Sequence, residues 1–392
     1  MLPTKKTVRD RSLRFLICSV SALIFFAPLM ALLAGKRGVP TENRVAYSAP
    51  SLNTGWRYFA DLGLFAGDRI PLRPRALTID AWIDQNMFDE DPAFGGNASP
   101  SVIHGSDGFL FLAEDFDNAC APTGTIDGAI QRMEEIGQMI SESGRRVVFV
   151  IPPNKSTIHR QLVPKDLAKF GCWSQFTTEL SESLSKTKTE GFLPVRQLID
   201  DEVARTRNPL YLRKDSHWNS LGSLVAIKAV VKTLEPAAWD DGEIIPEGLG
   251  TYIGDLTVLE GLPSKDEAEF FGVLRPQVTQ VSQVVLDQSL SLGLNLRFVN
   301  AGPKDSLVSG RSLLILDSFG EISLGRISPY FEDLTAIHFA NWEPNLFAEL
   351  IAQADNVWIM SVERYFTWRF TEFLGDPTFL ALLENKLNAM GD

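Results

Sequence analysis

The sequence has few of the residues that hold metals, and little basic charge outside its first segment. Its 392 residues include three cysteines and four scattered histidines, without the short spacings of zinc sites. The formal net charge is −12, and residues 1–37 carry a net +6, so the remainder is near −18. A nucleic-acid-binding protein needs a basic face, and the composition argues against that class. No Gly-x-x-x-x-Gly-Lys phosphate loop occurs, and we expect neither a metal nor a cofactor.

Long hydrophobic runs are absent too, with one exception at residues 15–34 (FLICSVSALIFFAPLMALLA). This segment has twenty residues and no charge, and as a helix it would span about 30 Å, the thickness of a bilayer's hydrocarbon core. Five basic residues precede it and two follow closely. Because the basic flank stays in the cytoplasm, the sequence predicts a single-pass anchor, a cytoplasmic tail at residues 1–14 and an exported remainder. A cleaved signal peptide, whose apolar region is usually shorter, and a buried core helix are the alternatives.

Two cysteines remain outside the apolar segment. These are Cys120 and Cys172, since Cys18 lies within residues 15–34. Disulfides persist in exported domains, so the sequence predicts a Cys120–Cys172 bond. Two buried free thiols are the alternative.

From residue 101 onward, short apolar runs alternate with longer segments of helical periodicity. Most strand candidates are continuous apolar runs, typical of strands buried on both faces of a parallel sheet. They are residues 146–151, 192–195, 312–316, 334–339 and 357–362. The helix candidates between them are residues 125–142, 175–186, 220–234, 345–354 and 376–388. This alternation predicts an α/β fold with a doubly wound parallel sheet, in which functional residues gather at the carboxyl ends of the strands.

The composition also suggests how the exported part is divided. Residues 35–100 are rich in Pro, Gly, Asn and Asp and hold one helix candidate, at residues 77–88, so we interpret them as a juxtamembrane lead-in. Residues 101–392 form the main domain. Within it, residues 237–308 are less regular and are a candidate insertion that carries short strands, with residues 277–286 among them.

One serine follows a predicted buried strand. In residues 312–320, SLLILDSFG, the strand ends at Asp317, Ser318 comes next, and a helix is expected to begin. Ser318 would then lie at a helix N-terminus, where unpaired backbone N–H groups can stabilise a developing oxyanion. A plain N-cap is the alternative interpretation.

An aspartate and a histidine lie two residues apart in YLRKDSHWNSLG, just before a predicted helix that Asn219 would cap. Asp215 fixed beside His217 could orient the imidazole and stabilise its charged form. A structural Asp–His contact at a surface cap is the alternative. Together with Ser318 these residues supply an acid, a base and a nucleophile for acyl transfer through a serine ester. Their order in the chain is no objection, because such sites are recognised by geometry.

Four stretches resemble the alginate acetylation proteins of the AlgJ/AlgX type, a periplasmic branch of the SGNH hydrolase-like superfamily. They are HGSDGFLFL at 104–112, IPPNKSTIH at 151–159, DSHWN at 215–219 and LDSFG at 316–320. The DSHWN block is the most specific, and the likeness extends over most of residues 45–370. In that family the serine block usually reads Gly-Asp-Ser. Here Leu316 replaces the glycine, a change that could narrow the acyl pocket.

The resemblance implies an SGNH-hydrolase-like, flavodoxin-like fold with Ser318 as nucleophile, His217 as general base and Asp215 as its orienting acid. It implies O-acetyl transfer to an exported polysaccharide, alginate or another exopolysaccharide, by a periplasmic domain tethered to the inner membrane. A multi-pass membrane O-acyltransferase is the expected partner and acetyl donor, because acetyl-CoA is cytoplasmic.

Four further polar residues follow predicted strands. Asn154 could donate to the oxyanion, and Lys155 could meet an acidic sugar. Arg364 and Tyr365 should lie on the rim of the site. Turn formation, solvation and a surface ion pair are the alternatives. The remaining histidines are expected to be structural or surface groups: His104, His159 and His338.

Two other functions stay open. An esterase or deacetylase would use the same triad with water as the acceptor, and would release acetate faster than it forms acetylated oligosaccharide. A non-catalytic carbohydrate-binding scaffold would organise a secretion or acetylation complex, and would not depend on Ser318.

Overall fold

The computed structural model describes residues 58, 61, 62, 65, 101–287, 290 and 293–389. The predicted anchor at residues 15–34 and the helix candidate at residues 77–88 lie outside them. Within the described ranges, no helix is long and apolar enough to cross a membrane. The chain divides into two compact units, of which one combines residues 1–101 with 257–264 and the other combines 102–256 with 265–392. The second unit contains the central sheet.

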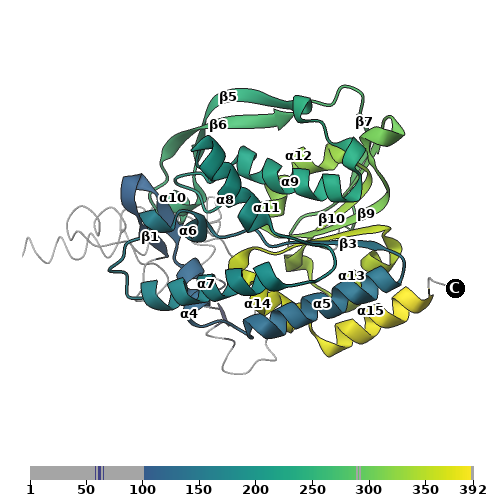
Figure 1. Cartoon of the computed structure of the whole chain (residues 1–392), viewed down its shortest axis with the longest axis horizontal. Helices are drawn as coiled ribbons and strands as arrows, with labels where there is room; N and C mark the ends of the chain where they lie inside the picture. Colours follow the sequence, from purple (N-terminus) through teal and green to yellow (C-terminus); the bar gives the residue numbers. More distant parts are fainter. Residues whose placement is uncertain are drawn as a thin grey trace, which may run out of the picture. The chain divides into compact units, whose positions relative to one another are not determined.

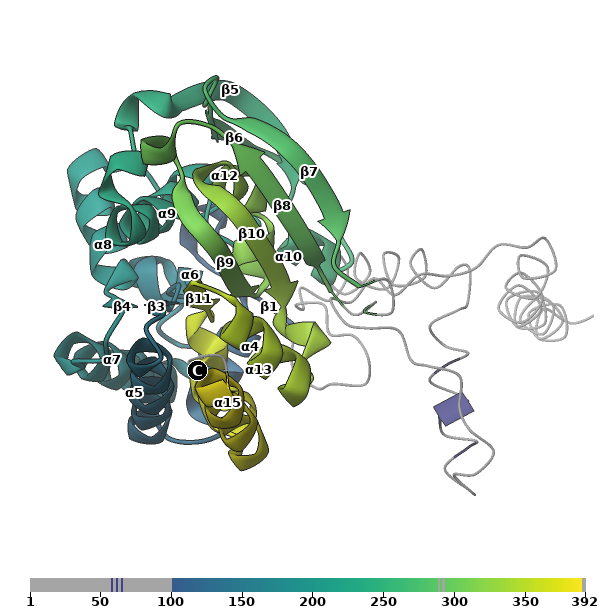
Figure 2. The same cartoon turned by 90° about the vertical axis from the view of Figure 1, so that its right-hand side faces the viewer.

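The largest sheet of the described chain has seven strands in the order β4-β3-β11-β9-β10-β8-β7 (Figures 1 and 2). The strands are β3 (Arg146–Val150), β4 (Phe192–Leu193), β7 (Thr279–Val285), β8 (Asn295–Ala301), β9 (Val308–Leu316), β10 (Phe331–His338) and β11 (Asn356–Met360). From β4 to β10 neighbouring strands run parallel, whereas β8 and β7 are antiparallel. The predicted α/β fold is confirmed. The sheet, predicted as parallel, is mostly parallel, because β8 and β7 add an antiparallel pair at one side.

Helices cover both faces of this sheet. Alternate residues of each strand point to opposite sides, so each strand contributes apolar side chains to two cores. In β3, Val148 and Val150 pack into one core with helices α8 (Val195–Thr206) and α9 (Ser220–Leu234). The intervening Val147 and Phe149 pack into a second core. The helices of that core include α5 (Ile126–Glu142), α13 (Pro344–Gln353) and α15 (Pro377–Ala389) (Figure 2). Strands buried on both faces explain the continuous apolar runs of the sequence.

Two of the helices begin at side-chain caps that the sequence makes visible. The Thr125 side chain accepts a hydrogen bond from the Gly128 N–H at 3.0 Å at the start of α5, and Asn219 does the same for Gly222 at the start of α9. An oxygen at this position satisfies an N–H that the first helical turn leaves unpaired. Helix α9 spans Ser220–Leu234 and ends two residues before Pro236. Its predicted bounds, residues 220–234, are confirmed.

The strand order decides where the functional loops meet. The last parallel strand, β11, lies between β3 and β9, so three neighbouring strands end at the middle of the same edge. Asn154 follows β3, Arg364 follows β11 and Ser318 follows β9. Residues at the carboxyl ends of adjacent parallel strands lie close together, and the candidate site is therefore expected at this edge.

The region of residues 237–308, predicted as a candidate insertion, contributes two different structures. Its first part forms an antiparallel hairpin of β5 (Ile244–Ile253) and β6 (Lys265–Val273), separate from the central sheet. The short helix α10 (Asp255–Leu259) follows β5. Its second part, β7 and β8, extends the central sheet, and β7 corresponds to the strand predicted at residues 277–286.

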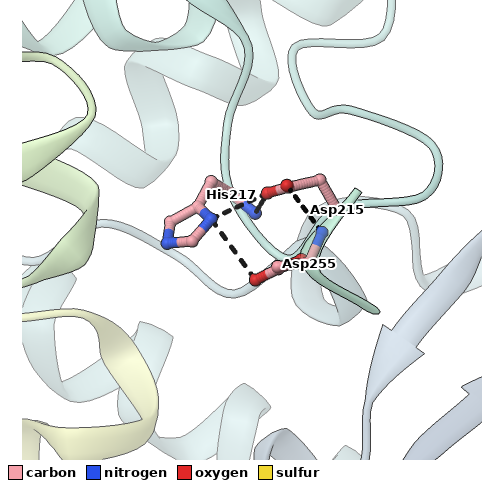
Figure 3. Close-up of side chains that lie close together, drawn as sticks. All are labelled: Asp215, His217 and Asp255. Carbon is pink, nitrogen blue, oxygen red and sulfur yellow. Dashed lines mark hydrogen bonds and ion pairs between the residues drawn. The ribbon is translucent and has the colours of Figure 1, made fainter. Parts of the chain in front are cut away.

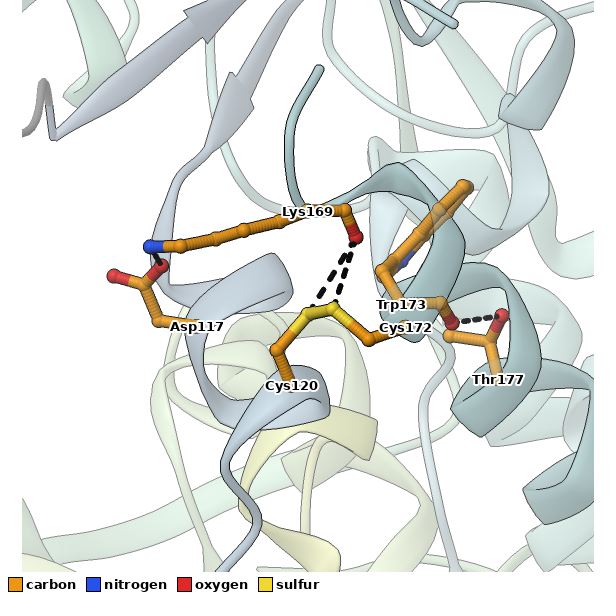
Figure 4. Close-up of a disulfide and its surroundings, with 6 residues drawn as sticks. All are labelled: Asp117, Cys120, Lys169, Cys172, Trp173 and Thr177. Atoms are coloured by element: carbon orange, nitrogen blue, oxygen red, sulfur yellow. Dashed lines mark hydrogen bonds and ion pairs between the residues drawn. A yellow bond between two sulfur atoms is a disulfide. The ribbon is translucent and has the colours of Figure 1, made fainter. Parts of the chain in front are cut away.

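A disulfide joins two helices near the start of the described domain (Figure 4). Cys120 at the end of α4 (Glu114–Cys120) is bonded to Cys172 in α7 (Phe170–Lys186), with a Cα separation of 5.1 Å. This is the pairing that the cysteine count predicts. The ammonium group of Lys169, the residue before α7, also forms an ion pair with Asp117 of α4. The second half of α4 is thereby fixed to the start of α7.

Candidate active site

Asp215 and His217 lie in the loop that precedes α9, and their side chains are in hydrogen-bond contact (Figure 3). His217 Nδ1 lies 2.7 Å from Asp215 Oδ1, and the His217 backbone N–H donates to the same oxygen at 3.0 Å. A bridge between Tyr211 and Trp218 closes this loop, and Asn219 caps the helix after it. The spacing of two residues therefore lets one carboxylate oxygen hold both the backbone and the ring of the histidine.

The Asp215 carboxylate remains ionised because its donors outweigh its burial. Burial alone would raise the pKa of Asp215, but the His217 hydrogen bonds and the Asp255 N–H, which donates to Oδ2 at 3.0 Å, hold that pKa below its ordinary value. A carboxylate in this state can fix the imidazole tautomer that carries its proton on Nδ1.

The second ring nitrogen of His217 is free to act as a base. His217 is 8% exposed, and its Nε2 is buried and has no hydrogen-bond partner among the described residues. The imidazole ring lies 5.0 Å from the ring of Phe319, centroid to centroid. The neighbouring Trp218 Nε1 donates to the Phe319 carbonyl oxygen at 3.2 Å. The DSHWN block is therefore packed directly on the LDSFG block.

Ser318 is the first residue of the short helix α11 (Ser318–Glu321), directly after β9 and the cap residue Asp317. Asp317 Oδ1 accepts the Phe319 N–H at 3.1 Å, which sets the turn that presents the serine. Ser318 is half-buried. Within the described chain no hydrogen bond joins Ser318 Oγ to His217, and Phe319 and Trp218 make the contact between the two segments.

The turn before Ser318 is also held by residues that follow the neighbouring strand β11. Asp317 Oδ2 accepts the Val362 N–H at 2.7 Å and Arg369 Nη1 at 2.6 Å. Burial would raise the pKa of Asp317, but the Arg369 charge and these donors keep it below its ordinary value. Sequence reasoning missed Arg369, because nothing local marks a buried arginine so far along the chain as the partner of Asp317.

Leu316 does not narrow an acyl pocket as expected from the sequence. Its side chain is fully buried in the core beneath the turn. A Cβ built on Gly320 would lie 2.7 Å from Leu316 Cβ and 3.3 Å from Met360 Sδ. Leu316 therefore occupies the space that the missing side chain of Gly320 leaves, and this pair accommodates the departure from Gly-Asp-Ser.

Lys155 is likewise not placed to meet a sugar. It is 2% exposed, and its Nζ donates to the carbonyl oxygens of Leu212, Arg213 and Asp215 at 3.2, 3.1 and 2.6 Å. Burial lowers the pKa of Lys155 to about 7, although Asp255 and Asp215 oppose the shift. Because only the ammonium form can donate three hydrogen bonds, these carbonyl oxygens also favour the charged state. Lys155 therefore holds the loop that carries Asp215 and His217, and its ammonium group points into the protein.

Asn154, Arg364 and Tyr365 lie side by side near the Ser318 turn. Arg364 Nη1 donates to Asn154 Oδ1 at 3.4 Å, and its guanidinium carbon lies 5.7 Å from the centroid of the Phe319 ring. The Arg364 side chain is 6% exposed and is paired with Asp115 at 3.5 Å, so the expected surface ion pair is instead buried. Tyr365 donates its hydroxyl to Glu114 at 2.7 Å.

Asp215, His217 and Asp255 also lie close enough together to bind a cation. Their ligand atoms are largely used by internal hydrogen bonds, however. Nδ1 is bonded to Asp215 at 2.7 Å, and the Asp255 carboxylate accepts the Ser216 N–H at 2.7 Å. Asp215 accepts three N–H groups. The donor set fits an oriented imidazole better than a metal centre, and we assign no ion to it.

The remaining histidines have structural surroundings. His159 is buried between Phe109 and Tyr211, and burial lowers its pKa to about 4. His338 Nδ1 accepts the Ala340 N–H at 2.9 Å and caps a short turn. His104 lies in strand β1 (Val102–His104).

The chain is similar to proteins of polysaccharide acetylation. Residues 102–264 match the family described as SGNH hydrolase-like domain, acetyltransferase AlgX. The probable alginate O-acetylase AlgJ of Pseudomonas syringae is 21% identical over 301 residues, which are 71% of this chain and 73% of that protein. The probable alginate O-acetylase AlgJ of Pseudomonas putida is 23% identical over 195 residues, 48% of this chain and 47% of that protein.

One solved structure shares the fold, and a second covers a similar part of the chain. Bacillus cereus PatB1 superposes with a TM-score of 0.50 at 11% identity, over 68% of this chain and 97% of that chain. The O-acetyltransferase domain of Pseudomonas putida AlgJ covers 73% of this chain and 99% of its own, with a TM-score of 0.46 and 18% identity.

The packing of Leu316 against Gly320 leads to a double-mutant test. Gly320→Ala should lower the free energy of unfolding by about 1–3 kcal/mol, because the new methyl group overpacks a full core. In a Leu316→Gly background, which removes the clashing Cβ, the same substitution should cost less. Urea denaturation of the four proteins measures the coupling, and strictly additive effects would contradict the complementary packing of this pair.

Buried Asp115 should make stability depend on pH. Burial raises the pKa of Asp115 from 3.8 to about 6, against the opposing effects of Arg364 and Ser156. The folded state therefore binds more protons than the unfolded state between about pH 4 and 6, and stability falls as pH rises through this window. The contribution is at most about 3 kcal/mol.

Urea denaturation at pH 4.5 and 7.5 tests this expectation, with Asp115→Asn as the comparison. The variant should lose the share of the pH dependence that Asp115 contributes and keep that of Glu363, whose pKa burial also raises to about 6. An identical pH dependence in the two proteins would show that Asp115 does not titrate in this range.

Proposed function

Because this chain belongs to the AlgJ/AlgX family of SGNH hydrolase-like alginate O-acetylases, we propose that it is a membrane-anchored O-acetyltransferase of the periplasm. Its substrate is an exported polysaccharide, alginate or another exopolysaccharide. Ser318 is the nucleophile, His217 the general base and Asp215 the orienting acid. One observation carries the proposal: an oriented histidine with a free Nε2 is packed, through Phe319, on the turn that bears Ser318.

The first half-reaction loads the serine. Ser318 Oγ attacks the acetyl carbonyl carbon of the donor as its proton passes to His217 Nε2, and Asp215 stabilises the imidazolium through Nδ1–H. We assign the backbone N–H of Ser318 as a donor to the developing oxyanion, because the N–H groups of Phe319, Gly320 and Glu321 already donate to Asp317. The bond between the acetyl carbon and the donor breaks, and the leaving group takes the proton from His217.

The second half-reaction moves the acetyl group to the polymer. A sugar hydroxyl gives its proton to His217 Nε2 and attacks the acetyl-serine carbonyl carbon. The bond to Ser318 Oγ breaks, and the oxygen recovers a proton from the imidazolium. The products are an O-acetylated sugar and the free enzyme, so the triad needs no cofactor of its own.

The acetyl donor has to be delivered from the cytoplasm. We assign this role to a multi-pass membrane O-acyltransferase that passes acetyl groups outward. The apolar segment at residues 15–34, with its basic flank at residues 5–14, supports an anchor that holds the domain beside such a partner.

Ser318→Ala should abolish turnover. With the full chain and a chromogenic acetyl ester, kcat/KM should fall at least about a thousandfold, as expected for loss of a serine nucleophile. Ser309→Ala is the matched control, because Ser309 is exposed on β9, away from its carboxyl end. Undiminished turnover by Ser318→Ala, with a native circular dichroism spectrum, would refute the mechanism.

The acceptor distinguishes a transferase from an esterase. When alginate oligosaccharide is added to the same assay, a transferase forms acetylated oligosaccharide faster than free acetate, and mass spectrometry measures both. Free acetate as the main product would assign the chain to the esterases.

The anchor makes a separate expectation for cell fractions. After an alkaline carbonate wash the chain should remain in the membrane pellet, because a spanning helix is not extracted with peripheral proteins. A soluble chain whose N-terminus lies beyond residue 34 would instead identify a cleaved signal peptide.

A further inference from the structure

A second carboxylate lies beside the catalytic histidine, from a residue that the sequence did not single out. Asp255 is the first residue of α10, and its Oδ2 is 3.6 Å from His217 Nδ1 (Figure 3). Its carboxylate also accepts both donors of Ser216, the backbone N–H at 2.7 Å and the hydroxyl at 2.5 Å. Ser216 is the one residue between Asp215 and His217, so Asp255 holds the residue that connects these two.

The contact between the two segments is reciprocal. The Asp255 backbone N–H donates to Asp215 Oδ2 at 3.0 Å, so each aspartate is fixed by the other's segment. Gly254 permits this approach, because a Cβ at that position would lie 1.8 Å from the Lys214 carbonyl oxygen. The approach is therefore a backbone feature, and the Asp255 side chain adds to it a charge and two hydrogen bonds.

The β5–β6 hairpin, which brings Asp255 to this place, holds the same loop at two further points. Arg213 Nε donates to Asp266 Oδ2 at 2.9 Å, and the Lys214 N–H donates to the Tyr252 hydroxyl at 3.3 Å. The segment that carries Asp255 is thus anchored on the catalytic loop, and its carboxylate is not a mobile surface group.

The charges that face His217 come from several elements. Asp215 lies on its own loop and Asp255 on α10. Lys155 of helix α6 (Lys155–Ile158) donates to the Asp215 carbonyl oxygen at 2.6 Å, and Arg364 lies over the Phe319 ring that packs on the imidazole. The two carboxylates are the ionic groups in contact with the ring nitrogen.

We propose that Asp255 is a positioning residue of the acetyl transfer. It holds Ser216 so that Asp215 and His217 keep their geometry, and its negative charge stabilises the imidazolium that forms in each half-reaction. The inference rests on the proposed function, since it assumes that His217 is the general base. A displaced base loses rate because proton transfer requires hydrogen-bond reach to the reacting group.

Asp255→Asn in the full chain separates the charge from the shape. With the chromogenic acetyl ester, kcat should fall about tenfold while KM stays unchanged, because the lost charge acts on the imidazolium and not on substrate binding. The acid limb of the pH profile of kcat should move to lower pH by up to about one unit, since an imidazolium with one negative neighbour fewer loses its proton more easily.

Two further variants complete the series. Asp240→Asn is the matched control: Asp240 caps an exposed turn by accepting the Gly242 N–H at 2.8 Å, and its loss should leave kcat and the pH profile unchanged. Ser216→Ala removes the hydroxyl contact and keeps the Asp255 charge. It should lower kcat by a few-fold without moving the acid limb.

A measurement without turnover checks the same inference. In Ser318→Ala protein with labelled histidine, the NMR titration of His217 should shift to lower pH when Asp255→Asn is added. An unchanged titration together with wild-type kcat in a folded Asp255→Asn protein would overturn the role of Asp255. If Asp255→Asn does not fold, a wild-type kcat in Ser216→Ala would overturn the claim that Asp255 positions the pair through Ser216.

The failure of this inference can be told from failure of the function. Full activity of Ser318→Ala would remove the triad itself. Loss of activity in Ser318→Ala beside normal behaviour of Asp255→Asn would leave the triad and reject Asp255 alone.

Discussion

The buried carboxylate of Asp317 is the interaction on which the candidate site depends. It accepts hydrogen bonds from the Phe319 N–H, the Val362 N–H and Arg369, and so ties the end of β9 to the segment that follows β11. A carboxylate this deeply buried is tolerated only when its oxygens are paired. The same three donors that compensate its charge also fix the backbone at Ser318. The hydrogen bonds that stabilise the buried Asp317 charge are therefore the same ones that position Ser318.

Around this centre, polar side chains hold loops that the sheet brings together but does not itself connect. Lys155 donates hydrogen bonds to three carbonyl oxygens of the loop before α9. Arg364, in the segment after β11, contacts Asn154 and Asp115. Satisfied networks of this kind rigidify a site, whereas a network that loses one member leaves buried groups unpaired. This is why residues that appear suited to bind a charged sugar are instead used inside the protein.

The features that were predictable from sequence are those encoded over short stretches. The strand before Ser318, the two-residue spacing of Asp215 and His217, and the Asn219 cap are all local patterns. The Cys120–Cys172 bond followed from the small number of cysteines. Asp255 and Arg369 could not be found in this way, because their contacts depend on how distant segments are folded. The antiparallel strands β7 and β8 have apolar patterns that do not reveal their direction, so the mixed edge of the sheet also went unpredicted.

The position of β11 between β3 and β9 has a consequence for how the domain is made. Strand β3 comes early in the chain and β11 comes late, so β3 and β9 cannot be joined through β11 until the late part of the chain has been made. Long-range parallel pairing is slow and leaves unpaired edges exposed meanwhile. The disulfide between α4 and α7 involves only residues that emerge early, and it can close the first part of the domain while the middle of the sheet is still open. The group of loops that carries Asn154, Ser318 and Arg364 is therefore complete only after nearly the whole chain has been made.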